Sequence, residues 1–90
     1  MTALIRIVRM TNKRGLHARA SAKFVNLAAG LPSVIEVEKD GNKVCGTSIM
    51  GLMMLGAAMG DDVTLHVSGD GAEESLEQLA TLIEGRFGED

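Results

Sequence analysis

Aromatic residues are scarce in this chain of 90 residues, which has two phenylalanines and neither tryptophan nor tyrosine. Proteins that bind single-stranded nucleic acid usually stack its bases on exposed aromatic rings, so the composition argues against that class. No apolar run approaches the ~20 residues that span a bilayer, and no signal-like segment opens the chain, so we expect no membrane insertion. The single cysteine, Cys45, cannot form an internal disulfide, which favours a reducing cytoplasm as the location.

Acidic residues are missing from the first 35 positions, which hold six cations, whereas residues 36–90 hold three cations and all twelve acids. The two segments therefore carry net charges of +6 and −9. A one-signed segment in an acidic chain is typical of a local anion site or of a contact face for an acidic partner. An overall charge of −3 gives no general attraction to phosphate backbones, so we expect no nucleic-acid partner. An ordinary solvated charged face is the alternative explanation.

The pattern of apolar residues predicts one domain over residues 1–90, because this length leaves no room for a second independent core. Alternation predicts strands at residues 3–10, 34–39, 43–47 and 63–68, with the Asp40-Gly41 pair as a hairpin turn. Helical spacing predicts helices at 18–29, 48–55 and about 72–84. The order βαββαβα predicts an α+β open-faced sandwich, with three helices on one face of a four-stranded, mainly antiparallel sheet.

The segment Gly15-Leu16-His17-Ala18-Arg19 breaks two rules for the start of a helix. His17 stands at the expected N-cap, where Ser, Thr, Asp or Asn is preferred, and Arg19 puts a cation at the positive end of the helix dipole. Such conflicts tend to cluster at functional sites. A phosphoryl group on the imidazole would resolve both, because first-turn N–H groups and a guanidinium bind phosphate oxygens and a neutral ring nitrogen can attack phosphorus. The alternative is a surface histidine that happens to lie near an arginine.

This segment and the helix after it resemble the active-site signature of HPr, the histidine-containing phosphocarrier family of the bacterial phosphoenolpyruvate-dependent phosphotransferase system. A second stretch, Ser48–Gly56, resembles the regulatory-serine segment and short second helix of the same family, so the resemblance covers essentially the whole chain. It implies that Nδ1 of His17 takes a phosphoryl group from phosphorylated enzyme I and passes it to a IIA domain, with Arg19 stabilising the phosphate. The sequence has no metal-ligand spacing and no Gly-rich nucleotide loop, so we expect no metal, no cofactor and no independent catalysis.

One position departs from the family pattern. The family usually has proline directly after the active-site arginine, and this chain has Ala20 there. Proline fixes φ and loses nothing in a first turn, where its missing N–H needs no partner. Alanine keeps the helix but gives up that rigidity, so we expect the carrier chemistry to survive with altered transfer rates or partner preference.

Two further features concern the second motif. Ser48 is a favoured N-cap residue, and the resemblance also implies regulatory phosphorylation of Ser48 by an HPr kinase/phosphorylase. Four of the six methionines lie between residues 50 and 59, and a short helix buries only one stripe, so we expect Leu52 and Leu55 in the core and some methionines exposed for docking. The resemblance implies a docking surface made of Ala18, Arg19, Ala22, Ile49, Met50, Met53 and Met54.

Two alternatives remain open from the sequence. A regulatory paralogue in a nitrogen-type phosphotransfer chain would use the same histidine with different partners. A binding module that holds an anionic ligand or acidic partner without covalent chemistry would also explain the basic N-terminal segment. His66 lies on the polar side of its strand and is expected to be exposed rather than to bind a ligand.

Overall fold

The computed structural model describes residues 3–89, which form a four-stranded antiparallel sheet, three α-helices and a short 3-10 turn. The elements are β1 (Leu4–Arg9), α1 (Ala18–Ala29), β2 (Ser33–Lys39), β3 (Asn42–Cys45), α2 (Ile49–Met54), β4 (Asp62–Gly69), α3 (Ala72–Glu84) and the turn η1 (Arg86–Gly88). The strand order is β1-β4-β2-β3, and every neighbouring pair is antiparallel. The predicted α+β sandwich and its element order are confirmed.

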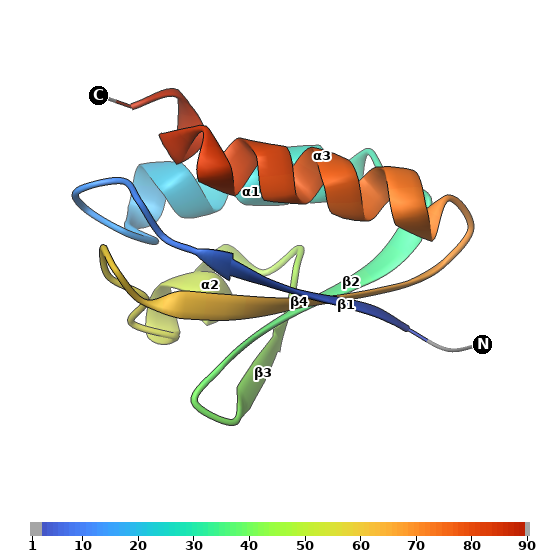
Figure 1. The fold of residues 1–90 in the computed structure, drawn as a ribbon, viewed down its shortest axis with the longest axis horizontal. Coiled ribbons are helices and arrows are strands. Elements are labelled where there is room, and N and C mark those ends of the chain that lie inside the picture. The colour runs from blue at the N-terminus through green and yellow to red at the C-terminus, as the bar shows by residue number, and fades with distance from the viewer. Residues whose placement is uncertain (1–2, 90) are drawn as a thin grey trace.

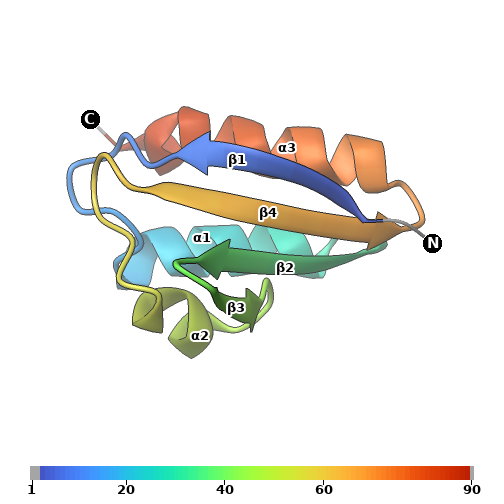
Figure 2. The same cartoon turned by 60° about the horizontal axis from the view of Figure 1, so that its bottom comes forward.

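The helices leave one face of the sheet uncovered. Helices α1 and α3 lie side by side over the other face (Figure 1), and α2 packs against α1 and β3 at the edge of the sheet. Figure 2 shows the four strands with α1 and α3 behind them. Within residues 3–89, no helix combines the length and apolar character needed to cross a membrane.

The core lies between the sheet and helices α1 and α3. Alternate residues of β4 point into it, with Leu65 and Val67 fully buried, and α3 contributes Leu79 from its apolar stripe. The two phenylalanines, Phe24 of α1 and Phe87 of η1, are each 1% exposed. Aliphatic side chains and two rings therefore fill the interior, as the composition requires.

Strand β1 has apolar residues on both faces, which is why the sequence does not define its buried side. Val8 is buried, and Arg6 reaches α3, where its guanidinium lies 3.0 Å from Glu77 Oε2. Ile5 and Ile7 lie on the uncovered face and are 63% and 66% exposed. The residues of β1 that are buried are those on the face covered by the helices, and their hydrophobicity alone does not distinguish them from the exposed ones.

Helices α1 and α3 have the predicted bounds, whereas the strand bounds differ. Strand β3 ends at Cys45 instead of residue 47, because Gly46 and Thr47 form a turn closed by a hydrogen bond from the Ser48 N–H to the Cys45 carbonyl, at 3.1 Å. Strand β4 extends one residue beyond the predicted 63–68 at each end, to Asp62–Gly69, because it pairs with both β1 and β2. Because β4 lies in the middle of the sheet and is paired on both sides, it is longer than the segment whose residues alternate.

Candidate active site

A glycine fixes the loop that leads into α1. Gly15 has a φ of +60°, and a Cβ at this position would lie 2.1 Å from the carbonyl oxygen of Ala57. The N–H of Leu16 donates to the same oxygen at 2.9 Å. Only glycine allows both this backbone conformation and this close approach. The loop before His17 therefore packs directly on the segment that follows α2, which brings the two sequence motifs together.

His17 is the N-cap of α1, as the sequence predicts. Its backbone is extended, and its Nδ1 accepts a hydrogen bond from the backbone N–H of Arg19 at 3.3 Å. Its carbonyl oxygen accepts the first helical hydrogen bond, from the Ser21 N–H at 2.9 Å. A ring nitrogen thus does what a serine hydroxyl or an aspartate carboxylate does at most N-caps.

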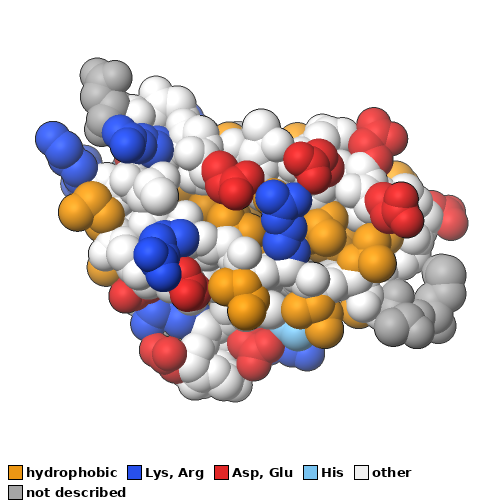
Figure 3. Space-filling view, viewed as in Figure 1, with side chains coloured by type: hydrophobic (Ala, Val, Ile, Leu, Met, Phe, Trp, Pro, Cys, Tyr) orange, Lys and Arg blue, Asp and Glu red, His pale blue; other side chains and the backbone are white. Residues whose placement is uncertain are grey.

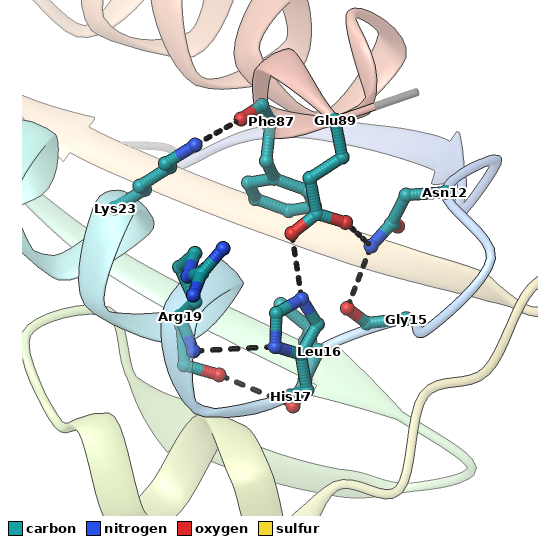
Figure 4. A network of polar contacts seen from close by, with 9 residues as sticks. Asn12, Gly15, Leu16, His17, Arg19, Lys23, Phe87 and Glu89 are labelled. Carbon is teal, nitrogen blue, oxygen red and sulfur yellow. Dashed lines mark hydrogen bonds and ion pairs between the residues drawn. The ribbon is translucent and has the colours of Figure 1, made fainter.

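The other ring nitrogen of His17 faces a carboxylate from the end of the chain. Nε2 lies 2.6 Å from Oε2 of Glu89, which follows the turn η1 (Figure 4). The second carboxylate oxygen accepts from the side-chain amide of Asn12 at 3.0 Å, and the same amide donates to the Gly15 carbonyl at 2.8 Å. The Glu89 and His17 side chains are only 19% and 16% exposed. Glu89, Asn12, His17 and Gly15 therefore form one connected polar network.

These two contacts of the ring decide which of its nitrogens carries the proton. A backbone N–H can only donate, so Nδ1 must present its lone pair to Arg19, and an ionised carboxylate can only accept, so Nε2 of the neutral ring must carry the hydrogen. Hydrogen bonds from Asn12, followed by those from His17, hold the pKa of Glu89 below its usual value. The carboxylate is therefore ionised at neutral pH, and the unprotonated Nδ1 lies at the start of α1.

The start of α1 offers several donors to an anion. The first turn contains no acidic residue, and among residues 3–89 no acceptor is found for the N–H groups of Ala18 and Ala20. Within the same described range the exposed Arg19 guanidinium forms no hydrogen bond or ion pair. Figure 3 shows several Lys and Arg side chains gathered at the end where the 11–15 loop lies, whereas Asp and Glu side chains are spread over this face and include a group near the start of α3. Part of the basic N-terminal segment thus forms a local concentration of positive charge.

Ser48 begins α2 beside this site. Its Oγ accepts a hydrogen bond from the Gly51 N–H at 3.0 Å, so the predicted N-cap is confirmed. Helix α2 lies beside the first part of α1 in both ribbon views (Figures 1 and 2). Leu52 and Leu55 are buried as predicted.

The residues expected to form the docking surface lie on these two neighbouring helices. Met54 is 81% exposed and Met50 69%, and Met53 and Ile49 are 40% and 41% exposed. Ala18 and Arg19 are exposed, and Ala22 is half-buried. Exposed apolar side chains from α2 thus adjoin a basic helix start.

Two further residues, His66 and Cys45, lie outside the site. His66 is not exposed as expected: its side chain is 14% exposed, because Nε2 lies 2.7 Å from Glu38 Oε1 on the neighbouring strand. Cys45 lies exposed at the end of β3, with its Sγ 3.1 Å from Thr47 Oγ1. Across residues 3–89, no group of three or more His, Cys, Asp or Glu side chains is arranged to hold a metal ion.

Sequence reasoning missed two residues of the site, Glu89 and its partner Asn12. Glu89 lies 72 positions after His17, and no local motif connects the two residues. The only available signal was indirect, since a histidine with one nitrogen at an N-cap leaves its other nitrogen in need of a partner.

The chain is similar to known proteins over most of its length. The family model described as "PTS HPr component phosphorylation site" matches residues 5–85. The phosphocarrier protein HPr of Cupriavidus necator is 47% identical over 78 residues, covering 87% of this chain and 88% of the relative. The phosphocarrier protein NPr of Shewanella violacea is 37% identical over 89 residues, covering 99% and 98%. The crystal structure of HPr-C-His from Thermoanaerobacter tengcongensis superimposes with a TM-score of 0.92 at 46% identity, covering 97% and 98% of the two chains.

Proposed function

Because the chain belongs to the HPr and NPr phosphocarrier family of the phosphotransferase system, we propose that Nδ1 of His17 carries a phosphoryl group between two partner proteins. The proposed donor is phosphorylated enzyme I, and the proposed acceptors are IIA domains. The observation that supports this role best is the contact between Nδ1 and the Arg19 N–H, which keeps the nitrogen unprotonated and next to free helix donors.

The proposed reaction needs little from the carrier itself. The Nδ1 lone pair attacks phosphorus, an N–P bond forms, and the bond between phosphorus and the donor breaks, with its electron pair staying on the donor. The Arg19 N–H then loses its acceptor on the ring and turns to a phosphoryl oxygen. The guanidinium of Arg19 offers a second, charged donor, so the phosphorylated ring lies in an anion-binding helix start.

Proposed regulation and docking use the neighbouring helix. We propose that phosphorylation of Ser48 by an HPr kinase/phosphorylase adds roughly −1.5 to −2 charge at the start of α2. The proposed docking surface comprises Ala18, Arg19, Ala22, Ile49, Met50, Met53 and Met54. A negative charge there would have to be desolvated when a partner covers the exposed methionines, so regulation would act on docking rather than on folding.

The partner set is a separate question, because the relatives include proteins named HPr and a protein named NPr. We propose the sugar-type acceptors first, because the HPr relative has the higher identity, 47% against 37%. Transfer from the phosphorylated carrier to purified sugar-type and nitrogen-type IIA domains tests this choice. Faster transfer to the nitrogen-type domain would reverse it.

A labelled-phosphate experiment tests the carrier role. The chain is incubated with enzyme I, labelled phosphoenolpyruvate and Mg²⁺, and acid-labile phosphate is counted on wild type, His17→Ala and His66→Ala. His66 is a matched control, because it is the only other histidine and lies on the uncovered face of the sheet. We expect one phosphate on wild type and on His66→Ala and none on His17→Ala.

The same variants separate the carrier from a non-covalent binding module. A module that only binds an anion or an acidic partner would lose binding in Arg19→Ala and keep it in His17→Ala. Label that survives in His17→Ala would refute the assignment of His17 as the phosphorylated residue.

A further inference from the structure

The contact between His17 and Glu89 joins two ends of the domain. Glu89 Oε2 lies 2.6 Å from His17 Nε2, and Figure 4 shows the Glu89 side chain reaching over the ring from the segment after η1. This nitrogen is not the one that the proposed chemistry phosphorylates. The carboxylate therefore leaves Nδ1 accessible while it occupies the opposite side of the ring.

The backbone before Glu89 is bent in an unusual way. Arg86 and Phe87 both have positive φ values, 59° and 54°, and Gly88 follows at 75°. A left-handed conformation costs a residue with a Cβ about 1–2 kcal/mol, so two in succession require compensation. Burial of the Phe87 ring provides it, together with a 2.6 Å hydrogen bond from Lys23 Nζ to the Phe87 carbonyl. Strain of this kind, held by packing, tends to serve a functional site, and here it directs Glu89 toward His17.

The surroundings of the carboxylate keep it in place and charged. Asn12 donates to its other oxygen, and Lys23 contributes a positive charge nearby. The Glu89 carboxylate is thus held by two hydrogen bonds, with the positive charge of Lys23 nearby.

We propose that Glu89 is a positioning residue for phosphoryl transfer: its carboxylate holds the proton on Nε2 and offsets the positive charge that the ring gains when Nδ1 bonds phosphorus. This inference rests on the proposed phosphorylation of His17. Nδ1 gives its lone pair to phosphorus, so the ring becomes a phosphoimidazolium with its hydrogen still on Nε2. A carboxylate at hydrogen-bond distance stabilises that cation more than the neutral ring. When the phosphoryl group leaves for an acceptor, the ring returns to its neutral form with the same proton in place.

The two transfers therefore need no proton exchange with solvent. The carboxylate also orients the ring, because Nε2 is bound on one side while the Arg19 N–H binds Nδ1 on the other. A ring held at both nitrogens cannot flip Nδ1 away from the helix start. Positioning of this kind lowers the entropic part of a barrier.

Steady-state phosphorylation by enzyme I tests the proposal with the full chain. Glu89→Gln keeps the size of the side chain and an oxygen that can accept from Nε2–H, but it removes the charge. We expect kcat to fall about tenfold, with KM for the carrier changed less than twofold, because Glu89 is mostly covered and acts through the ring. Glu73→Gln is the matched control: it makes the same change in net charge on an exposed residue of α3, and we expect wild-type kinetics.

Proton NMR supplies a readout that a purely structural role would not move. Circular dichroism and the Arg19 amide signal should stay as in wild type in Glu89→Gln, because the N-cap remains. We expect the His17 Nε2–H signal far downfield in wild type, further upfield in Glu89→Gln, and lost through solvent exchange in Glu89→Ala.

The outcomes separate this proposal from the carrier role. If wild type accepts phosphate on His17 and Glu89→Gln has the same kcat, or a higher one, Glu89 does not assist transfer. If wild type accepts no phosphate on His17, the carrier role itself fails. A rise in KM at constant kcat would make Glu89 a docking residue and overturn the proposed positioning role.

Discussion

The N–H of Leu16 donates to the carbonyl oxygen of Ala57 at 2.9 Å, so the residue before His17 is attached to the segment that follows α2. This hydrogen bond ties the two motifs together through the backbone alone. Gly15 makes it possible, since any Cβ there would meet the same oxygen. The geometry at His17 therefore depends on a residue that takes no part in chemistry.

Gly15→Ala should destabilise the domain by more than the ~1–2 kcal/mol that a left-handed backbone costs a residue with a Cβ. The extra cost comes from the clash with Ala57. Gly56→Ala is a matched control, because Gly56 has a similar φ of +67° but nothing within 4 Å of an added Cβ. Urea unfolding measures the loss of stability in both variants. Equal losses would show that the loop moves away from the added Cβ at no extra cost in stability.

Ala20→Pro should stabilise the domain by about 0.4–1 kcal/mol, because proline restricts the unfolded chain at a position whose native conformation it can adopt. Ala20 is in the first turn of α1, and its N–H has no acceptor within residues 3–89. The residue is fully buried, so its neighbours must make room for the ring. Thermal unfolding measures the change. A melting temperature below that of wild type would mean that the neighbouring side chains cannot accommodate the proline ring.

Ser48→Asp should keep the fold and slow phosphorylation of His17 about tenfold. Aspartate can replace the serine as the N-cap of α2, so circular dichroism and melting temperature should change little. Its charge must be desolvated when a partner covers the adjoining apolar surface. Ser48→Ala should instead lose about 1 kcal/mol of stability with the loss of the cap and keep the wild-type rate.

Thr47→Asp is the control for Ser48→Asp, because it puts the same charge on the exposed residue just before the N-cap. Rates of phosphorylation by enzyme I are compared at low and high salt. Identical rates for wild type, Ser48→Ala and Ser48→Asp at low salt would leave Ser48 as a cap without a regulatory role.

Met53→Asp should weaken binding to enzyme I at least tenfold without unfolding the domain, because Met53 is 40% exposed within the proposed docking surface. Met59→Asp is the control: Met59 is 58% exposed but lies outside that surface. Arg19→Glu should also weaken binding, because it reverses a charge at the basic helix start. Titration calorimetry measures all three, and unchanged affinity in both Met53→Asp and Arg19→Glu would remove this surface from the account.

The stability contributed by Glu89 should depend on pH with a definite sign. Hydrogen bonds lower the pKa of Glu89 in the folded chain from an ordinary value of 4.5, so folding favours its ionised form. The contribution is therefore fully present above about pH 4.5 and is lost as pH falls through the lowered folded pKa. Urea unfolding of wild type and Glu89→Gln should show wild type more stable at pH 7, with the difference shrinking below pH 4.5. A difference that grows as pH falls below 4.5 would contradict the assignment.

Local signals in the sequence predicted much of this structure. The caps His17 and Ser48 and the apolar stripes of α1 and α3 lie within a few residues of what they determine, so the helix starts were predicted correctly. Burial on β1 could not be predicted, because Ile7 and Val8 are equally apolar and only the packing of α3 distinguishes them.

Contacts between distant residues account for the other differences. The pairing of His66 with Glu38 depends on strand register. The approach of Glu89 to His17 depends on a bent turn after the last helix. Neither contact produces a periodic or local pattern in the sequence, so both can be identified only in the folded structure.

The most direct test of the account is to locate the phosphorus atom. The ¹⁵N-labelled chain is phosphorylated by enzyme I with phosphoenolpyruvate and Mg²⁺, and nitrogen–phosphorus couplings are recorded by NMR. The geometry predicts one phosphorus atom, coupled to Nδ1 of His17, with Nε2 still carrying its hydrogen. Phosphorus bound to Nε2, to His66 or to no histidine would contradict the central claim.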